Sequence, residues 1–263
     1  MIVFIYTLFL VLAFSFHTFG AEDWHPFPMS WNRAPVNLSH YLDAPAGKHG
    51  FLDIRDKTLV FEDDTPARFW GVTMTGAACF PSHRDAPVIA ERLSQLGVNL
   101  VRFQHLDAPW AEISLFTKTS NQALSFNAAA FDRLDYFIFQ LKNRGIYTAL
   151  SCLDSRQLQP GEQIPWFETI PPGFKGYVHF VQPLRHLYKE FLSAFWSHFN
   201  PYTGKEYRDS PEIVLADIFS NNTAFDIRDP APYYQDMLQR RWAEWCKTNE
   251  IDPVPAFTTD SLS

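Results

Sequence analysis

Two groups of polar and aromatic side chains lie at or just after the end of an apolar run that predicts a β-strand, one run at 98–103 and one at 213–219. In chain order they are Arg102, His105, Trp110, Ser220, Asn221 and Asn222. A guanidinium group can hold a carboxylate through two hydrogen bonds, and an indole ring can stack on the C–H face of a sugar. An asparagine amide hydrogen bonds but does not transfer a proton near neutral pH. These residue types favour ligand binding over acid–base chemistry.

Other candidate residues carry weaker signals. Asp217 lies inside the second of these runs, where a structural hydrogen bond is the simpler interpretation. Asp226 follows the run and is the alternative position for an acid, and Trp166 lies in a loop that could contact a sugar. The three cysteines have no metal-binding spacing, so the sequence predicts neither a metal nor a cofactor.

From residue 68 onward, predicted strands alternate with predicted helices, which favours an α/β fold with a parallel sheet. The strands are expected at 69–74, 98–103, 146–153 and 213–219; the helices are expected at 86–96, from about 127, at 183–199 and at 232–247. Gly97 and Gly145 should end the first two helices. The loop at 73–81 contains only Gly76 and so lacks a glycine-rich phosphate cradle, which favours a barrel over a nucleotide-binding sheet.

The amino-terminal part predicts two further segments. Residues 1–20 are almost entirely apolar up to Phe16 and end in Gly20, as in a secretory signal peptide cleaved after Gly20, although an uncleaved anchor is the alternative. Short apolar runs within 21–67 predict a small β-hairpin appendage. The expected organisation is therefore a signal peptide (1–20), an appendage (21–67), a barrel-like domain (68–250) and a tail (251–263), in a secreted or periplasmic protein.

The composition limits the class of partner. The net charge is -7 and no cluster of Lys and Arg opposes it, so the sequence predicts no nucleic-acid binding. A hydrophobic content of 46% over 263 residues is sufficient for one substantial core.

Several segments, in the same order along the chain, resemble secreted cellulase-like enzymes of glycoside hydrolase clan A, near family 5. These segments are 45–51, 68–72, 96–102, 105–107 and 200–204. The resemblance implies a (β/α)8 barrel that hydrolyses a β-linked polysaccharide with retention and without a cofactor. It also implies two opposed glutamates, an acid/base in an Asn-Glu pair after the fourth strand and a nucleophile after the seventh.

The chain departs from this pattern at decisive places. Ser220, Asn221 and Asn222 stand where the family has Asn-Glu-Asn, so Asn221 occupies a degenerate acid/base position. A complete barrel takes about 250 residues, which leaves no room here for strands five to eight. We therefore expect a partial barrel of about four βα units. Arg102, which orients the catalytic carboxylate in the family, then pairs with Asp107 or another acid.

The leading expectation is a glycoside hydrolase-like pseudoenzyme, truncated and inactive by itself. A rival hypothesis is a protein that binds a poly- or oligosaccharide without cutting it, through Arg102, His105, Trp110, Ser220 and Asn222. For His105, a contact with a substrate hydroxyl and a hydrogen bond to the loop backbone are both open. Two further hypotheses remain: half of a split barrel, completed by a second chain or by a homodimer, and a non-functional remnant.

Overall fold

The computed structural model describes residues 36–117, 125–227 and 229–252. The chain divides into two units, Met1–Arg33 and Ala34–Ser263, and all described residues belong to the second. The predicted signal peptide and most of the predicted tail therefore lie outside the described residues. Within those ranges, no helix combines the length and the apolar character needed to cross a membrane.

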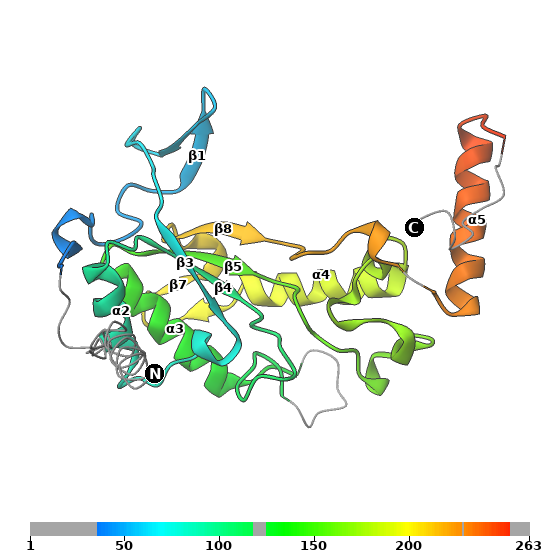
Figure 1. Cartoon of the computed structure of the whole chain (residues 1–263), viewed down its shortest axis with the longest axis horizontal. Coiled ribbons are helices and arrows are strands. Elements are labelled where there is room, and N and C mark those ends of the chain that lie inside the picture. Colours follow the sequence, from blue (N-terminus) through cyan, green and yellow to red (C-terminus); the bar gives the residue numbers. More distant parts are fainter. Residues whose placement is uncertain (1–35, 118–124, 228, 253–263) are drawn as a thin grey trace, which may run out of the picture. The chain divides into compact units, whose positions relative to one another are not determined.

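A four-stranded parallel sheet forms the centre of the described unit (Figure 1). Its strands, in spatial order, are β3 (Gly71–Thr75), β4 (Leu100–Gln104), β5 (Tyr147–Ser151) and β8 (Ile213–Asp217). The predicted α/β class is confirmed. The first strand begins later than predicted because the Trp70 N–H bonds the Asn99 side chain at 2.6 Å instead of a strand backbone. The last strand ends at Asp217, two residues before the predicted end.

In the described ranges, four α-helices accompany the strands in the order that the sequence predicts. They are α2 (Ala86–Gln95), α3 (Ala128–Lys142), α4 (Gln182–Trp196) and α5 (Pro232–Thr248). Gly97 and Gly145, which follow α2 and α3, both have φ +74°, the left-handed conformation that favours glycine after a helix. Asn127 caps α3 by accepting the Ala130 N–H at 3.3 Å. The third helix ends earlier than predicted, because Phe199 belongs to a short hairpin of β6 (Phe199–Asn200) and β7 (Lys205–Glu206).

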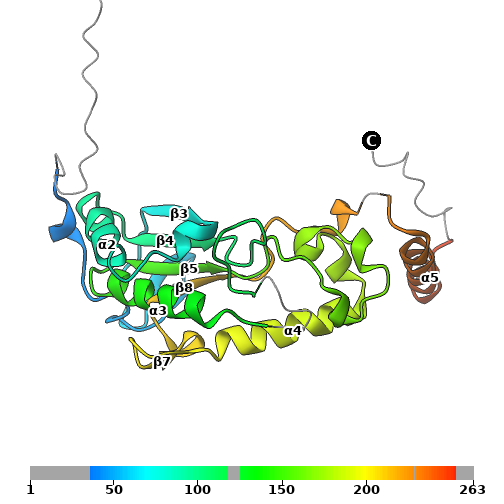
Figure 2. The same cartoon turned by 90° about the horizontal axis from the view of Figure 1, so that it is seen from below.

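The core lies between the sheet and α2, α3 and α4, which run along one face of it (Figure 2). Side chains alternate between the two faces of a strand, and β4 shows this directly. Val101 and Phe103 point to the helices and are fully buried, whereas Arg102 and Gln104 point to the opposite face and are half-buried. That opposite face, called here the inner face, therefore carries polar groups.

An antiparallel hairpin of β1 (Leu52–Arg55) and β2 (Thr58–Phe61) precedes the sheet, as the sequence predicts. It has a separate apolar cluster in which Phe61 packs against Tyr147, with ring centroids 5.1 Å apart. Leu100 and Val214, from the beginnings of β4 and β8, pack against the same cluster. The hairpin therefore covers the amino ends of these strands, so the candidate site must lie at their carboxyl ends, called here the carboxyl edge.

Candidate functional site

An ion pair links β4 to β8 on the inner face, and a serine of β5 bonds to it. Nη2 of Arg102 lies 2.5 Å from Oδ2 of Asp217, and the Ser151 hydroxyl donates to the same oxygen at 3.0 Å. In the strand register, Arg102 is aligned with Ala149, and Ala149 with Leu215, so the long Arg102 side chain reaches two residues further along the sheet to Ser151 and Asp217, which are aligned with each other. The acid that pairs with Arg102 is therefore Asp217, and the expected alternative, Asp107, is wrong. The Asp217 carboxylate has a structural partner, as its position in the strand indicates.

Asp107 has a different task. It is 4% exposed and accepts backbone N–H groups of Asp154, Ser155 and Arg156, each at 3.0 Å. Burial raises the pKa of this carboxyl to about 6, against the opposing effect of the N–H donors. Asp107 therefore fixes the turn that follows β5 and is not available to Arg102. No local sequence signal marks this role, since the three donors come 47 to 49 residues later.

Gln104 and Ser220 meet at the carboxyl edge, where the Gln104 amide donates to the Ser220 hydroxyl at 3.2 Å. Ser220 is 1% exposed, so the structure places this predicted binding residue in the interior. Gln104 was not predicted from the sequence, although its alternation with Arg102 along one strand places it on the same face.

Asn221 and Asn222 are adjacent but differ in their surroundings. The Asn222 amide accepts the Gly176 N–H at 2.8 Å and donates to the Gly173 carbonyl at 2.9 Å, so it ties the loop after β8 to the loop after β5. Asn221 is exposed, has φ +46°, and its side chain makes no hydrogen bond to any residue in the described ranges. The backbone carbonyl of Asn221 accepts from Lys175 Nζ at 2.6 Å. Asn221 thus presents a free amide, and not an acid, at the position predicted to be degenerate.

His105 and Trp110 lie beyond β4. The His105 N–H donates to Asp154 at 2.8 Å, and its ring Nδ1 lies 2.6 Å from the Ser155 hydroxyl. The Trp110 ring is 5.8 Å from the imidazole, centroid to centroid, and is 64% exposed. Gly76 makes this position possible, because a Cβ there would lie 2.9 Å from the indole. His105 is therefore held by the loop, whereas Trp110 offers an open aromatic face.

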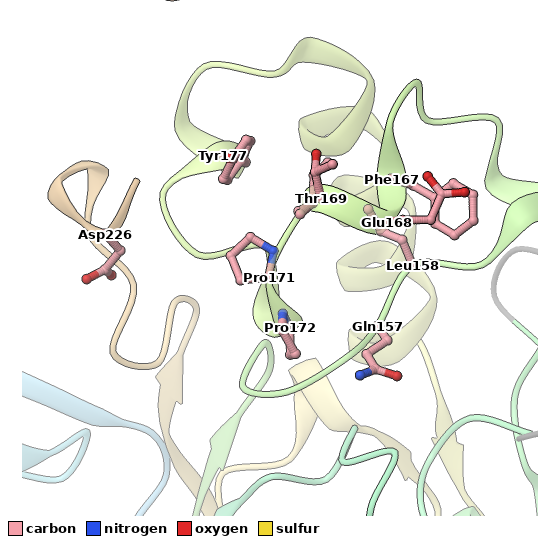
Figure 3. Close-up of a pocket in the computed structure, with 10 residues that line it drawn as sticks. Gln157, Leu158, Phe167, Glu168, Thr169, Pro171, Pro172, Tyr177 and Asp226 are labelled. Carbon is pink, nitrogen blue, oxygen red and sulfur yellow. The ribbon is translucent and has the colours of Figure 1, made fainter. Parts of the chain in front are cut away.

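A pocket of about 570 Å³ lies beside the loop between β5 and α4, and the sequence did not predict it (Figure 3). Ten residues line it: Gln157, Leu158, Phe167, Glu168, Thr169, Ile170, Pro171, Pro172, Tyr177 and Asp226. Asp226, the alternative acid, accepts the Thr223 N–H at 2.9 Å. Figure 3 shows Asp226 on one side of the pocket and Glu168 on the other. Trp166 is 59% exposed next to this lining.

The described residues contain no group of three or more His, Cys, Asp or Glu side chains placed to hold a metal ion. The three cysteines, Cys79, Cys152 and Cys246, are buried and free. Burial raises the pKa of the Cys79 thiol to about 12, so this thiol is not a nucleophile at neutral pH.

No protein-family model matches the sequence, and no curated protein matches it. Among solved structures, an endo-1,4-beta-mannanase from Rhizomucor miehei matches with 16% identity and a TM-score of 0.49 over 64% of this chain and 48% of that one. An endo-beta-1,4-mannanase from Thermotoga petrophila matches with 20% identity and a TM-score of 0.42, over 71% and 41%. A glycoside hydrolase family 5 protein from Bacteroides vulgatus matches with 19% identity and a TM-score of 0.41, over 76% and 38%. The chain spans about half the length of the first of these.

Proposed function

We propose that this chain is a glycoside hydrolase-like protein with part of a (β/α)8 barrel, and that it binds a β-linked oligo- or polysaccharide without hydrolysing it. The observation that carries this proposal is the exposed amide of Asn221 at the carboxyl edge. Retaining hydrolysis needs one carboxyl group to protonate the leaving oxygen and another to attack from the opposite face. Asn221 supplies no acid there, and Asp217, the acidic residue of β8, belongs to the same strand that leads into Asn221 and not to an opposed one.

Binding is supported by the residues that remain accessible at this edge. Trp110 offers an exposed ring, and Asn221 offers an amide with both a donor and an acceptor. Sugar sites commonly combine an aromatic face with a few fixed polar groups. Asp154 accepts the His105 N–H and the Ser155 hydroxyl contacts the His105 ring, so His105 is fixed beside Trp110.

The test is calorimetric titration of the purified chain with β-1,4-linked gluco- and manno-oligosaccharides. We expect Trp110→Ala to weaken binding by about 1–3 kcal/mol, the range for losing a stacked aromatic side chain. Trp70→Ala is the matched control, since Trp70 is 70% exposed but lies immediately before β3, at its amino end. The proposal fails if no β-linked glycan binds, or if the unmodified chain releases reducing sugar.

A second proposal concerns assembly. In the described unit, β3 and β8 each pair on one side only, so both carry a free backbone edge. Such edges are places where another strand can add. We therefore also propose that a second chain, or a second copy, completes the barrel. Sedimentation would show a dimer or a stoichiometric complex, whereas a monomer that binds glycans would exclude this proposal.

Export is the third part of the proposal, and it rests on the apolar character of residues 1–20. Amino-terminal sequencing of the protein recovered from the producing cell tests it. A mature chain that starts at Ala21 supports export with cleavage after Gly20, and a retained Met1 contradicts it.

A further inference from the structure

The pocket beside the loop between β5 and α4 is preformed. Its volume of about 570 Å³ lies within the range of about 300–1,000 Å³ typical of small-molecule sites. A buried ion pair between Arg156 and Glu162, whose side chains are 7% and 0% exposed, anchors this loop. The Arg156 guanidinium also stacks on the Phe116 ring, 4.6 Å from its centroid. These contacts hold the loop in place without a ligand.

Further contacts hold the walls of the pocket. The Tyr177 ring packs edge-on against Tyr234 of α5, with centroids 5.1 Å apart. The Tyr234 hydroxyl donates to the Pro165 carbonyl, just before the lining segment begins. On the other side, the Asn222 amide bridges Gly173 and Gly176, so the loop that carries Asp226 is tied to the loop that carries Glu168.

The charge in this pocket is unbalanced. Glu168 and Asp226 are acidic, and none of the ten lining residues in the described ranges is Lys, Arg or His. Glu168 has no hydrogen bond or ion pair with any described residue, and Asp226 uses only one oxygen, in its bond to the Thr223 N–H. The nearby Arg156 is occupied by Glu162. A positively charged ligand would therefore be attracted electrostatically to this pocket, whereas a neutral ligand would not.

The remaining lining residues indicate which type of positively charged ligand fits the pocket. Phe167, Pro171 and Pro172 provide apolar surface, while Gln157 and Thr169 provide neutral hydrogen-bonding groups. A bare metal ion needs several oxygens that converge on one point, but the two carboxylates lie on opposite sides of the pocket (Figure 3). A sugar ring with hydroxyl groups and one ammonium group matches this mixture of surfaces.

We propose that this pocket binds an amino sugar with a free, protonated amine, as part of a de-N-acetylated β-linked glycan. The proposal rests on the proposed glycan-binding function and names its ligand class and a second place of contact. The ammonium group lies near Glu168 or Asp226, and the ring packs on Phe167.

The experiment compares β-1,4-linked glucosamine oligosaccharides with N-acetylglucosamine oligosaccharides of the same length. Binding to the full chain is measured by calorimetry at mildly acidic pH and low salt, where the amine is charged. We expect the free-amine glycan to bind about five- to tenfold more tightly. Glu168→Gln should lower its affinity about two- to fivefold, the range for an ion pair at a partly exposed site, and leave the N-acetylated glycan unchanged.

Glu244→Gln is the matched control, because Glu244 is an exposed glutamate on α5 that does not line the pocket. An amine preference that survives Glu168→Gln, or that Glu244→Gln lowers equally, overturns the inference and assigns the effect to the net charge of the chain. Binding of neutral glycans that depends on Trp110, without any amine preference, also overturns it but leaves the proposed function intact. Amine binding that depends on Glu168, with no Trp110 dependence, supports the pocket and contradicts the site at the carboxyl edge.

Discussion

Arg102 and Asp217 are 115 residues apart in the chain, yet their side chains form an ion pair with a 2.5 Å separation between Nη2 and Oδ2. Ser151, on the strand between them, hydrogen bonds to both. This contact joins β4, β5 and β8 on the inner face of the sheet. It also engages the carboxylate of β8, since Asp217 is the acidic residue in this strand.

The strength of this ion pair can be measured by a double-mutant cycle with Arg102→Leu and Asp217→Asn. The two side chains are 39% and 35% exposed, so solvent screens the pair and we expect a coupling energy of about 1 kcal/mol in urea denaturation. The exposed pair of Arg84 and Asp85 is the control, with coupling near zero. Equal coupling in both pairs would contradict a structural role for the contact between β4 and β8.

Replacing Asn221 by glutamate should not create a hydrolase. The new carboxyl group would restore an acid at the carboxyl edge, but retaining hydrolysis also needs a second carboxyl group that attacks from the opposite face of the sugar. Asp217 belongs to β8, the strand that leads into residue 221, so we do not expect it to supply that group. We expect the release of phenol from aryl β-glycosides to stay at the level of Asn221→Gln, which differs only in its terminal group. Turnover above that control would refute the assignment of this chain as non-hydrolytic.

Asp107→Asn should loosen the turn after β5. The carboxylate accepts three backbone N–H groups with its two oxygens, and an amide keeps only one oxygen. At least one buried donor is then left without a partner, at a cost of about 1–3 kcal/mol. Urea denaturation measures the loss, and hydrogen exchange at residues 154–156 should speed up. Asp56→Asn, in the exposed turn of the hairpin, is the control; a loss no larger than in this variant would contradict the role of Asp107.

His49 makes the stability of the hairpin region depend on pH. Its two ring nitrogens contact Asp43 at 2.6 Å and Asp63 at 2.5 Å, and hydrogen bonds to these carboxylates raise the pKa of the imidazole above 6.5. A raised pKa means that the folded state binds the proton more tightly, so this contribution to stability is complete below pH 6.5 and is lost as the pH rises through the raised value. Asp63 contributes with the opposite pH dependence. The hydrogen bonds from His49 and Thr65 lower the pKa of the Asp63 carboxyl from 3.8 to about 2. That contribution is lost as the pH falls from 3.8 through 2.

Thermal melts of the wild type and His49→Gln across this range test the prediction. The difference in melting temperature between the two proteins should shrink as the pH rises above 6.5, because the neutral imidazole no longer donates to both carboxylates. A constant difference from pH 5 to 9 would show that the ring acts only through its packing on Phe61, 5.8 Å away.

The amino-acid sequence by itself determined the order and type of the main elements. Periodic apolar residues mark α3, Asn127 marks its start, and Gly145 marks the turn after it; each of these signals acts within one or two helical turns. The interpretation of Asn221 as a degenerate acid/base position also comes from the sequence, and it stays a prediction. Such local signals predict the ends of strands imprecisely. At β8, for example, Ile218 and Phe219 are apolar but lie outside the strand.

Only the tertiary structure decided which groups meet. The pairing of Arg102 with Asp217 follows from strand register, and the burial of Asp107 and Ser220 follows from loops that approach each other across more than 40 residues of chain. The pocket at Glu168 and Asp226 likewise joins two loops that are far apart in the sequence. Periodicity and spacing report the environment of a residue along one element, whereas these contacts depend on how separate elements are placed in space.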